Sequence, residues 1–543
     1  MKLKLKFASV TLLFAMSNIL ISQAQSVPAG IHGNFQSDVQ YYRVDSSIGA
    51  PIVPQKVLTN GFANINYTNN NFSCGLRYES YLNVLQGYDA RFKGNGILYR
   101  YAQYNKDNLD VTVGSFYEQF GSGMILRSYE ERGLGYDNAF DGVRVKYNPT
   151  PGLYMKGFIA RQRAYFDYGP GIVRGFDTEL NFAELMPKAS EKGWQLSLGG
   201  SFVSKYQKDE DALKKLPENV GAFSTRANLG YKGFTFNAEY AYKYNDPSAV
   251  NTFIYKEGQS FLTSFGYTKK GLGINLTAKR IDNMDYRSDR TETVSTVLIN
   301  FMPAIARQYT YRLLTLYPYA TQPMGEMGAM AELYYTFKPN TGLGGKTGMY
   351  MAINSTYVNN LKATPDTNGY GYTSNFLAIG KEHYYADVNV ELTKKLSKKA
   401  KITLNYVYIE YNKNVLEGKL DYGVIYSHTG ILDFTYKFNH TKSIRTELQH
   451  LYTKQDLGSW AMALVEFSMA PHWSVAAFAE YNYGNKKPDD RFFYPNVSST
   501  YVHNSNRFSL SYGKQRAGLL CVGGVCRFVP ASNGVSFTVS SSF

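Results

Sequence analysis

The stretch GVSFTVSSSF, residues 534–543, alternates apolar and small polar side chains up to a final phenylalanine. Val535, Phe537 and Val539 share one face, and serines and a threonine occupy the other. Such a strand suits the wall of a transmembrane barrel, which has hydrocarbon outside and water inside. Taken alone, the stretch also fits a half-buried strand of a soluble sandwich. Phe543 favours the outer membrane, and we expect it to act as a terminal signal for barrel assembly.

The first 24 residues have the pattern of a secretory signal peptide. Three lysines precede an apolar run over 7–21, and small residues stand at the two cleavage-determining positions. The rest of the sequence has no uninterrupted apolar run of about 18 residues, the length that a transmembrane helix needs. We therefore expect residues 25–543 to form one domain that crosses a membrane with β-strands.

The chain is rich in aromatic residues and moderately basic. It has 48 Tyr, 33 Phe and 48 Gly but 3 Trp, and a formal net charge of +15. Strands that are half lipid-facing and half water-facing give a composition of this kind. The basic residues are scattered along the chain, so nucleic-acid binding is not expected. Three explanations of the excess positive charge stay open. It can belong to an ordinary basic surface, it can meet the phosphates of lipopolysaccharide, or it can favour anions in a lumen.

Residues 221–245 give the clearest example of a pattern that repeats along the chain. Phe223 and Leu229 lie on one predicted face with Arg226 opposite, and a turn at 232–233 leads into a second alternating run. This predicts a β-hairpin with one apolar and one charged face. The same alternation recurs over 152–163, 193–206, 260–282, 329–338, 347–358, 382–394, 399–412, 425–454, 457–484 and 505–515.

Tight turns alternate with longer polar connections between these runs. The longer loops are predicted near 44–57, 83–95, 207–220, 246–258, 359–381 and 485–504. Outer-membrane barrels have short periplasmic turns, long external loops and, in bacterial single chains, an even number of strands. The sequence therefore predicts an all-β fold, a single large antiparallel transmembrane β-barrel of about 24 to 26 strands, with a range of about 22 to 26. The last connection, around 530–534, is then expected to be an external turn just before the final strand, with the 521–526 loop on or near the penultimate strand.

Two segments interrupt the alternation, near 114–140 and 282–328. A barrel of this size leaves a wide lumen unless something fills it. The first segment is dense in glycine, aromatic and charged residues, and its glycines allow tight inward bends. Two interpretations stay open for both segments: an inward-folded constriction or partial plug, and an ordered external loop.

Charged residues on the inner face of the clearest strands are the candidate functional residues. Mixed charges along a wet wall can set a transverse field that tunes solute selectivity, or they can pair and hold an inward loop in place. The predicted lumen-lining residues are Arg226, Glu239, Lys243, Asp387, Glu391, Arg445 and Glu447.

Two of the three cysteines, Cys521 and Cys526, frame a short glycine-containing loop. In an oxidising compartment we expect a structural disulfide between them, with Cys74 left free in the wall. A metal site is disfavoured because no histidine or second cysteine pair lies nearby in sequence. Redox catalysis remains an alternative, although the two-residue spacing of oxidoreductase motifs is absent.

The sequence carries no linear motif of an enzyme. The histidines, at 32, 383, 428, 440, 450, 472 and 503, stand singly and have no metal-ligand spacing. There is no nucleophile elbow and no P-loop. A Ser-His-Asp site assembled across strands is the alternative that linear motifs leave open. We expect no enzymatic activity, no metal and no cofactor.

Three stretches resemble the large outer-membrane barrels of unknown function of the Bacteroidota. They are YGKQRAGLLCVGGVCRFVPASNGVSFTVSSSF (512–543), GSFYEQFGSGMILRSYEERGLGYDNAFDGVRVKY (114–147) and, more weakly, GKEHYYADVNVEL (380–392). The resemblance spans the mature chain. It implies a barrel in the cell outer membrane, supplies no catalytic residues, and permits a role as a subunit of a larger envelope assembly.

Two functions are therefore expected. The first is a porin-like channel or transporter for an unidentified solute. The second is a partly plugged structural or scaffold barrel in an envelope complex for secretion or outer-membrane protein assembly. The partners expected are outer-membrane lipid and lipopolysaccharide, the barrel-assembly machinery during insertion, and other envelope proteins in the scaffold case.

Overall fold

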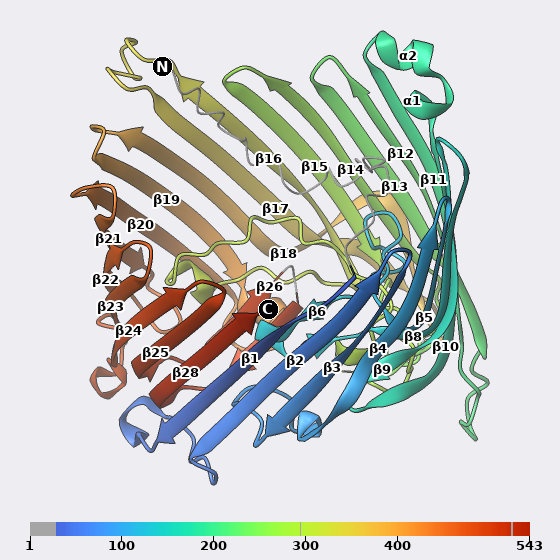
Figure 1. Cartoon of the computed structure of the whole chain (residues 1–543), viewed down its shortest axis with the longest axis horizontal. Coiled ribbons are helices and arrows are strands. Elements are labelled where there is room, and N and C mark those ends of the chain that lie inside the picture. The colour runs from blue at the N-terminus through green and yellow to red at the C-terminus, as the bar shows by residue number, and fades with distance from the viewer. Residues whose placement is uncertain (1–28, 294, 523–524) are drawn as a thin grey trace.

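A computed structural model describes residues 29–293, 295–522 and 525–543, and these form a closed antiparallel β-barrel (Figure 1). The predicted signal peptide, residues 1–24, lies outside the described residues. One sheet contains 24 strands, and β1 pairs with both β2 and β28, so the sheet has no edge. The predicted barrel is confirmed, and its strand number lies within the predicted range.

The wall strands of the first half are β1 (Gly30–Arg43), β2 (Val57–Asn69), β3 (Phe72–Leu82), β4 (Gly94–Lys106), β5 (Leu109–Phe116), β8 (Phe140–Thr150), β9 (Leu153–Ala164), β10 (Asp167–Asn181), β11 (Trp194–Tyr206), β12 (Asn219–Tyr231), β13 (Phe234–Lys243) and β14 (Gly258–Lys269). Those of the second half are β15 (Leu272–Asp282), β16 (Gly325–Phe337), β17 (Met349–Pro365), β18 (Tyr372–Lys395), β19 (Ala400–Asn412), β20 (Val424–Lys437), β21 (Lys442–Tyr452), β22 (Trp460–Met469), β23 (Trp473–Tyr481), β24 (Phe493–His503), β25 (Asn506–Gln515) and β28 (Ser532–Ser542).

Several short elements lie outside this sheet. They are the strands β6 (Glu130–Glu131), β7 (Tyr136–Asp137), β26 (Gly518–Val522) and β27 (Val525–Val529), the helices α1 (Phe182–Leu185), α2 (Pro187–Glu191) and α3 (Lys413–Leu416), and the 3-10 helices η1 (Ser46–Ile48), η2 (Ala90–Phe92), η3 (Arg132–Leu134), η4 (Ser295–Val297), η5 (Leu314–Leu316) and η6 (Pro488–Asp490). Among the described residues, no helix is long and apolar enough to cross a membrane.

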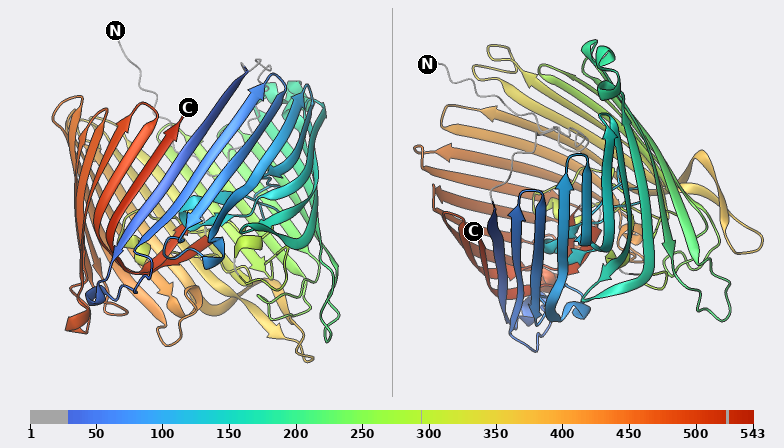
Figure 2. Two further views of the ribbon diagram at one scale, coloured as in Figure 1. Left: turned by 60° about the horizontal axis from the view of Figure 1, so that its bottom comes forward. Right: turned by 45° about the vertical axis from the view of Figure 1, so that its right-hand side comes forward.

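The two rims of the barrel differ in the length of their connections. We call the rim where β1 begins and β28 ends the terminal rim, and the opposite one the distal rim (Figure 2). Turns of two residues, such as 232–233 and 270–271, join strands at the terminal rim, although 182–193 and 338–348 are longer. The connections 44–56, 83–93, 207–218 and 244–257 all lie at the distal rim, as the sequence predicts.

Two of the predicted long loops are wrong in extent, because both contain strand. The expected loop 359–381 is mostly hairpin, with a connection at 366–371 between β17 and β18. Its register shifts three times between Val358 and Ala363, which removes the strict alternation that marks a strand in sequence. The expected loop 485–504 contains all of β24. Pro495 hides this strand in the sequence, because proline is unusual inside a sheet. The pairing of β24 with β25 begins at Asn496, so the missing N–H of Pro495 breaks no hydrogen bond to β25.

The last connection also differs from expectation. β28 already begins at Ser532, so residues 532–534 are strand and not turn. The loop 521–526 is not on a wall strand either. It is the end of a separate hairpin, β26–β27, inserted between β25 and β28.

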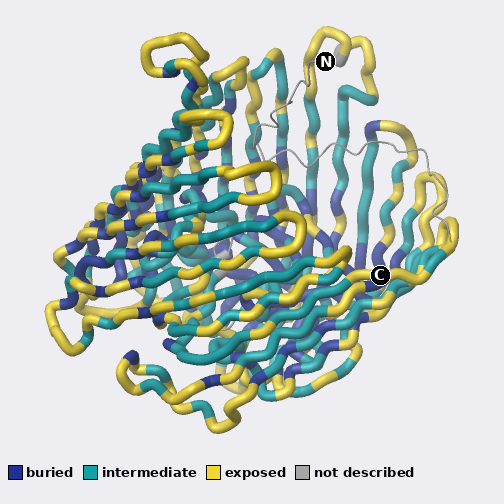
Figure 3. Tube along the Cα trace, turned by 60° about the vertical axis from the view of Figure 1, so that its left-hand side comes forward, coloured by how far each residue is buried: buried dark blue, intermediate teal, exposed yellow. Residues whose placement is uncertain are grey.

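Side chains along the wall alternate between an outward apolar face and an inward polar face. On β12, for example, Phe223 and Leu229 are exposed whereas Ser224 and Arg226 are buried. Figure 3 shows this alternation along the strands and the exposed turns at the rims. Some buried inward charges are paired within the wall, as Arg226 is with Asp177 of β10, whereas others reach the connections between strands, as Lys243 does at the Asp285 carbonyl.

Candidate functional site

A first inner segment, residues 117–139, connects β5 to β8 through the inside of the barrel (Figure 2). Phe120, Ile125 and Leu126 are fully buried. They belong to an apolar cluster with inward-facing residues of β9 to β15, including Phe158 and Val203. The structure therefore places this connection on the inner side of the wall and gives it an apolar core there.

Four buried charged residues anchor this segment to two wall strands. Arg163 on β9 donates to Glu79 of β3 through two nitrogens, both at 2.7 Å, and to Asp137 of the segment at 2.7 Å. Arg77 on β3 donates to Glu79 at 2.8 Å and pairs with Asp137. Two arginines thus share two carboxylates, and each charge is compensated in a site shielded from water.

A second inner segment, residues 283–324, crosses the lumen between β15 and β16. Near one wall, Gln162 of β9 donates to the carbonyl of Leu298 at 2.6 Å. Near the other, Arg312 forms an ion pair with Glu480 of β23. These two strands stand on opposite sides of the 24-stranded sheet, so the segment spans the barrel. Between them, Leu313 and its neighbours pack on inward-facing residues of β18 to β22.

The β26–β27 hairpin forms a third inner element. A disulfide joins Cys521 and Cys526, and Cys74 on β3 is free. At the base of the hairpin, Arg516 donates to Glu480 at 2.9 Å and to the carbonyl of Arg312 at 3.0 Å. On its other strand, Arg527 lies 3.9 Å from the centre of the Tyr88 ring. The hairpin therefore ties the second inner segment to the distal connection between β3 and β4.

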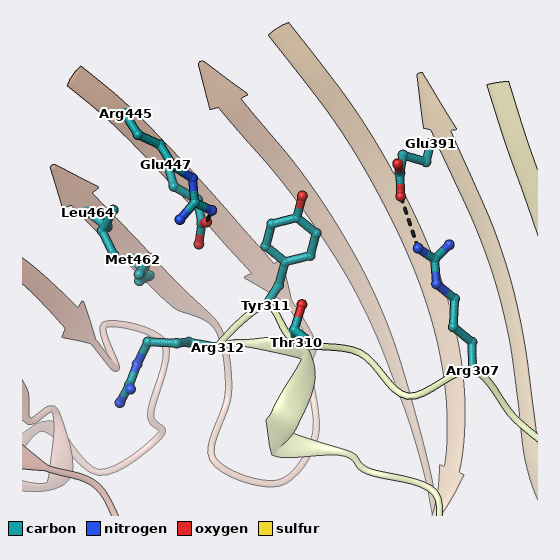
Figure 4. A pocket seen from close by; sticks show the side chains of 9 residues that line it. All are labelled: Arg307, Thr310, Tyr311, Arg312, Glu391, Arg445, Glu447, Met462 and Leu464. Atoms are coloured by element: carbon teal, nitrogen blue, oxygen red, sulfur yellow. Dashed lines mark hydrogen bonds and ion pairs between the residues drawn. The ribbon is translucent and has the colours of Figure 1, made fainter. Parts of the chain in front are cut away.

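A cavity of about 430 Å³ lies where the second inner segment approaches β18, β21 and β22. Figure 4 shows its lining, which is Arg307, Thr310, Tyr311, Arg312, Glu391, Arg445, Glu447, Met462 and Leu464. Three arginines and two glutamates from the segment and the wall therefore meet beside two apolar side chains.

Each arginine of the cavity has a carboxylate partner. Arg307 pairs with Glu391 at 3.0 Å and also donates to two wall asparagines. Arg445 pairs with Asp433 at 2.8 Å and with Glu447. About a third of each arginine side chain is exposed, so the paired charges still face the cavity. The site is a polarised surface of mixed sign and not a dedicated anion site.

Tyr311 projects into this cavity as a neutral hydrogen-bonding group. Burial raises the pKa of Tyr311 to about 12, and the carboxylates of Asp433, Glu391 and Glu447 add to the effect, against a smaller opposing contribution from Arg445. The phenol therefore stays protonated at physiological pH. It can donate a hydrogen bond to a solute without adding charge.

The seven residues that the sequence singles out all lie on the inner face, but at separate places. Glu391, Arg445 and Glu447 line the cavity. The other four hold inner segments or neighbouring strands. Glu239 accepts from the Ser122 amide, Asp387 from Tyr309, Lys243 donates to the Asp285 carbonyl, and Arg226 bridges Asp177 and Glu179.

The sequence prediction missed the partners of these residues. Arg307 and Arg312 lie in the segment flagged as irregular, but nothing in its composition shows which wall strand it meets. Glu480 lies between two apolar residues on β23, at a position that the alternation of the strand assigns to the inner face. This alternation is the signal that could have identified it as a lumen-facing charge. Arg163 and Glu79 carry the same pattern on β9 and β3. No group of histidine, cysteine or acidic side chains within the described ranges could hold a metal ion.

A family model described as a family of unknown function (DUF6029) matches residues 3–543. The chain belongs to this family. No curated protein matches the sequence.

Several solved structures are similar to the chain at low sequence identity. A mutant ferric enterobactin receptor of Pseudomonas aeruginosa, in complex with enterobactin, has 10% identity and a TM-score of 0.44, over 96% of this chain and 82% of that chain. The translocation pore of the P pilus usher has 11% identity and a TM-score of 0.40, over 94% and 98%. OccAB4 of Acinetobacter baumannii has 8% identity and a TM-score of 0.35, over 96% and 100%. At this level of similarity, a conclusion about function has to come from the residues of this chain.

Proposed function

We propose that this protein is a non-enzymatic outer-membrane β-barrel that passes small polar solutes through a lumen narrowed by its own inner segments, in the manner of a porin. Large apolar side chains such as Leu276, Leu404 and Val465 stand on the outward face, as a lipid-facing wall requires. We place the terminal rim, which has the shorter turns, on the periplasmic side, and the distal rim, which has the longer connections, on the exterior side.

One observation carries the channel proposal. At the cavity beside the second inner segment, Arg307, Arg312 and Arg445 stand close to Glu391 and Glu447. Opposite charges that face a solute path orient a polar solute and select among ions. The unidentified solute is therefore a small polar or zwitterionic molecule.

Planar-bilayer conductance tests this function. The purified full chain is expected to give discrete conductance steps. Replacing residues 305–320 with a short glycine-serine linker is expected to raise the conductance, because the lumen-crossing segment is removed. Arg445→Gln is expected to move the reversal potential in a salt gradient toward cation preference. Absence of both conductance and solute flux from correctly folded protein would contradict the proposal.

A second function is favoured by the packing of the interior. The inner segments have their own apolar clusters and a buried four-residue charge cluster, which are features of a fixed plug. In this second function the protein is a plugged structural or scaffold barrel, to which other proteins of an envelope complex attach. Gentle detergent extraction should then recover the chain with partner envelope proteins, and recovery of the lone chain would count against this role.

Lipid, lipopolysaccharide and the assembly machinery remain the partners that we propose. The Bacteroidota origin suggested by the sequence stays a prediction.

A further inference from the structure

A shallow groove crosses the outer wall over β13 to β17, and its volume is about 540 Å³. Its floor is made by small residues in register on neighbouring strands, where Ala278 pairs with Ala329 and Ala331 pairs with Ser355. The groove is bordered by the exposed side chains of Phe236, Phe265, Leu276 and Tyr357. With neighbouring strands about 4.8 Å apart, a groove over five strands is about 19 Å long. This upper bound on the length is comparable with that of an extended acyl chain.

Arg280 stands at the distal border of this groove. It lies on the same face of β15 as Ala278, about 7 Å further along the strand. The side chain is 2% exposed. Its Nη2 donates to Asp282 at 3.1 Å and to Ser374 at 2.8 Å, whereas Nε and Nη1 have no acceptor among the described residues. An outward-facing, buried guanidinium with two unused donors is costly unless an acceptor reaches it.

The β17–β18 hairpin covers Arg280 from outside the wall. Its Phe376 ring lies 4.9 Å from the guanidinium carbon and contacts Tyr240 and Phe261, which are outward residues of β13 and β14. In Figure 2, right, the tip of this hairpin stands outside the barrel. The hairpin therefore forms the distal border of the groove and brings polar groups to the outer surface.

The charge around Arg280 is positive on balance. Asp282 is shared by Arg280, Tyr372, Ser374 and Lys256, the last at 3.6 Å. Two cations thus face one carboxylate, which already accepts from three hydroxyl or guanidinium donors. The free donors of Arg280 remain available for a second anion.

We propose that this outer face is a binding site for a phosphate-bearing membrane lipid, with the phosphate on Arg280 and one acyl chain in the groove. The inference rests on the proposed membrane location. An apolar groove bordered by a guanidinium with unpaired N–H donors matches a molecule with a long hydrocarbon chain and an anionic head, because a phosphate oxygen can accept a charge-assisted hydrogen bond from one of these donors. Phe376 has to rotate away from the guanidinium to admit the head group.

Native mass spectrometry of the full chain in a neutral detergent tests the site. Dioleoylphosphatidic acid is the probe, and dioleoylglycerol, which has the same acyl chains and no phosphate, is the comparison. We expect one tightly bound phosphatidic acid per chain and weaker binding of the diacylglycerol. Arg280→Gln should weaken phosphatidic acid binding about tenfold to a hundredfold, the range for a hydrogen bond to a charged group. Ala329→Leu fills the groove and should weaken both lipids.

Matched controls separate the site from general effects on the barrel. Ala463→Leu makes the same change at an exposed outward alanine of β22 and should leave binding unchanged. Ala329→Leu also keeps the test valid if Arg280→Gln fails to fold. Inorganic phosphate at millimolar concentration should not displace the lipid, because it lacks the acyl chain.

Several results would overturn the site. One is equal binding of phosphatidic acid by the wild type and by folded Arg280→Gln and Ala329→Leu variants, and another is binding of diacylglycerol as tight as that of phosphatidic acid. Displacement of the lipid by inorganic phosphate, or capture of a polypeptide in cells by a photo-crosslinker at position 329, would also overturn it. Failure of the chain to insert into phosphatidylcholine vesicles would instead contradict the membrane location. Insertion without retention of phosphatidic acid would overturn the lipid site alone.

Discussion

Arg163 shows at the scale of one residue how the interior is held. Its guanidinium is 1% exposed and joins two carboxylates from parts of the chain 58 positions apart in sequence, Glu79 of β3 and Asp137 of the first inner segment. Because both carboxylates are also buried, neither can recover its lost hydration from water. Without Arg163, Arg77 would have to compensate both of these carboxylates, and it already pairs with Glu130 as well.

Arg163→Gln is therefore expected to lower the free energy of unfolding by about 3–5 kcal/mol, the cost of breaking a buried ion pair from one side. Urea unfolding in detergent, followed by heat-modifiable migration in gels, measures the change. Arg100→Gln is the matched control. The Arg100 side chain is 53% exposed and pairs with Asp141, so its loss should change stability by no more than about 1 kcal/mol. Equal urea midpoints for the two variants would contradict the anchoring role of Arg163.

At the scale of elements, the seam between β1 and β28 closes the wall. The two strands pair from Asn34 with Ser542 to Arg43 with Asn533. Phe543 follows β28 and exchanges two backbone hydrogen bonds with Gly33, each 3.0 Å long. A Cβ on Gly33 would clash with the Asn64 carbonyl oxygen and lie 2.9 Å from the Phe543 ring, so only glycine fits here and the ring packs closely over it.

Deleting Phe543 should reduce assembly of the barrel, because it removes two seam hydrogen bonds and the ring that covers Gly33. The fraction of heat-modifiable protein in isolated outer membranes measures assembly. Phe543→Tyr retains the ring and the backbone bonds and should assemble normally. If the shortened chain reached the membrane as efficiently as the wild type, Phe543 would be neither an assembly signal nor a necessary part of the seam.

At the scale of the whole molecule, wall and interior depend on each other. A 24-stranded barrel without inner elements would leave many inward charges facing a wide aqueous lumen. Here the two inner segments and the β26–β27 hairpin compensate those charges toward the distal rim. They leave the cavity at Arg307 and Arg445 as a polar recess inside the barrel. The same architecture is therefore compatible with solute conduction and with attachment of partner proteins. Conductance in a planar bilayer distinguishes the two, because only a channel gives conductance steps.

The wall was largely predictable from sequence because its determinants are local. Apolar side chains at every second position must face one side of a strand, and the alternation in 221–245 reproduces the paired strands β12 and β13. The prediction from alternation failed where the strands are irregular, at the bulged hairpin of β17 and β18 and at Pro495 of β24. The identity of the inward charges on the regular strands follows from the same alternation.

Patterns along the chain are enough to predict the antiparallel wall, the alternation of its two faces and the pairing of Cys521 with Cys526. Tertiary structure decided which way the irregular segments fold and which charges meet, since Arg307 with Glu391 and Arg163 with Glu79 are each 84 positions apart. Strand periodicity is a property of neighbours in sequence, whereas these contacts depend on where a closed sheet brings distant strands. For this reason the cavity, the buried charge cluster and the groove beside Arg280 become visible only in the folded barrel.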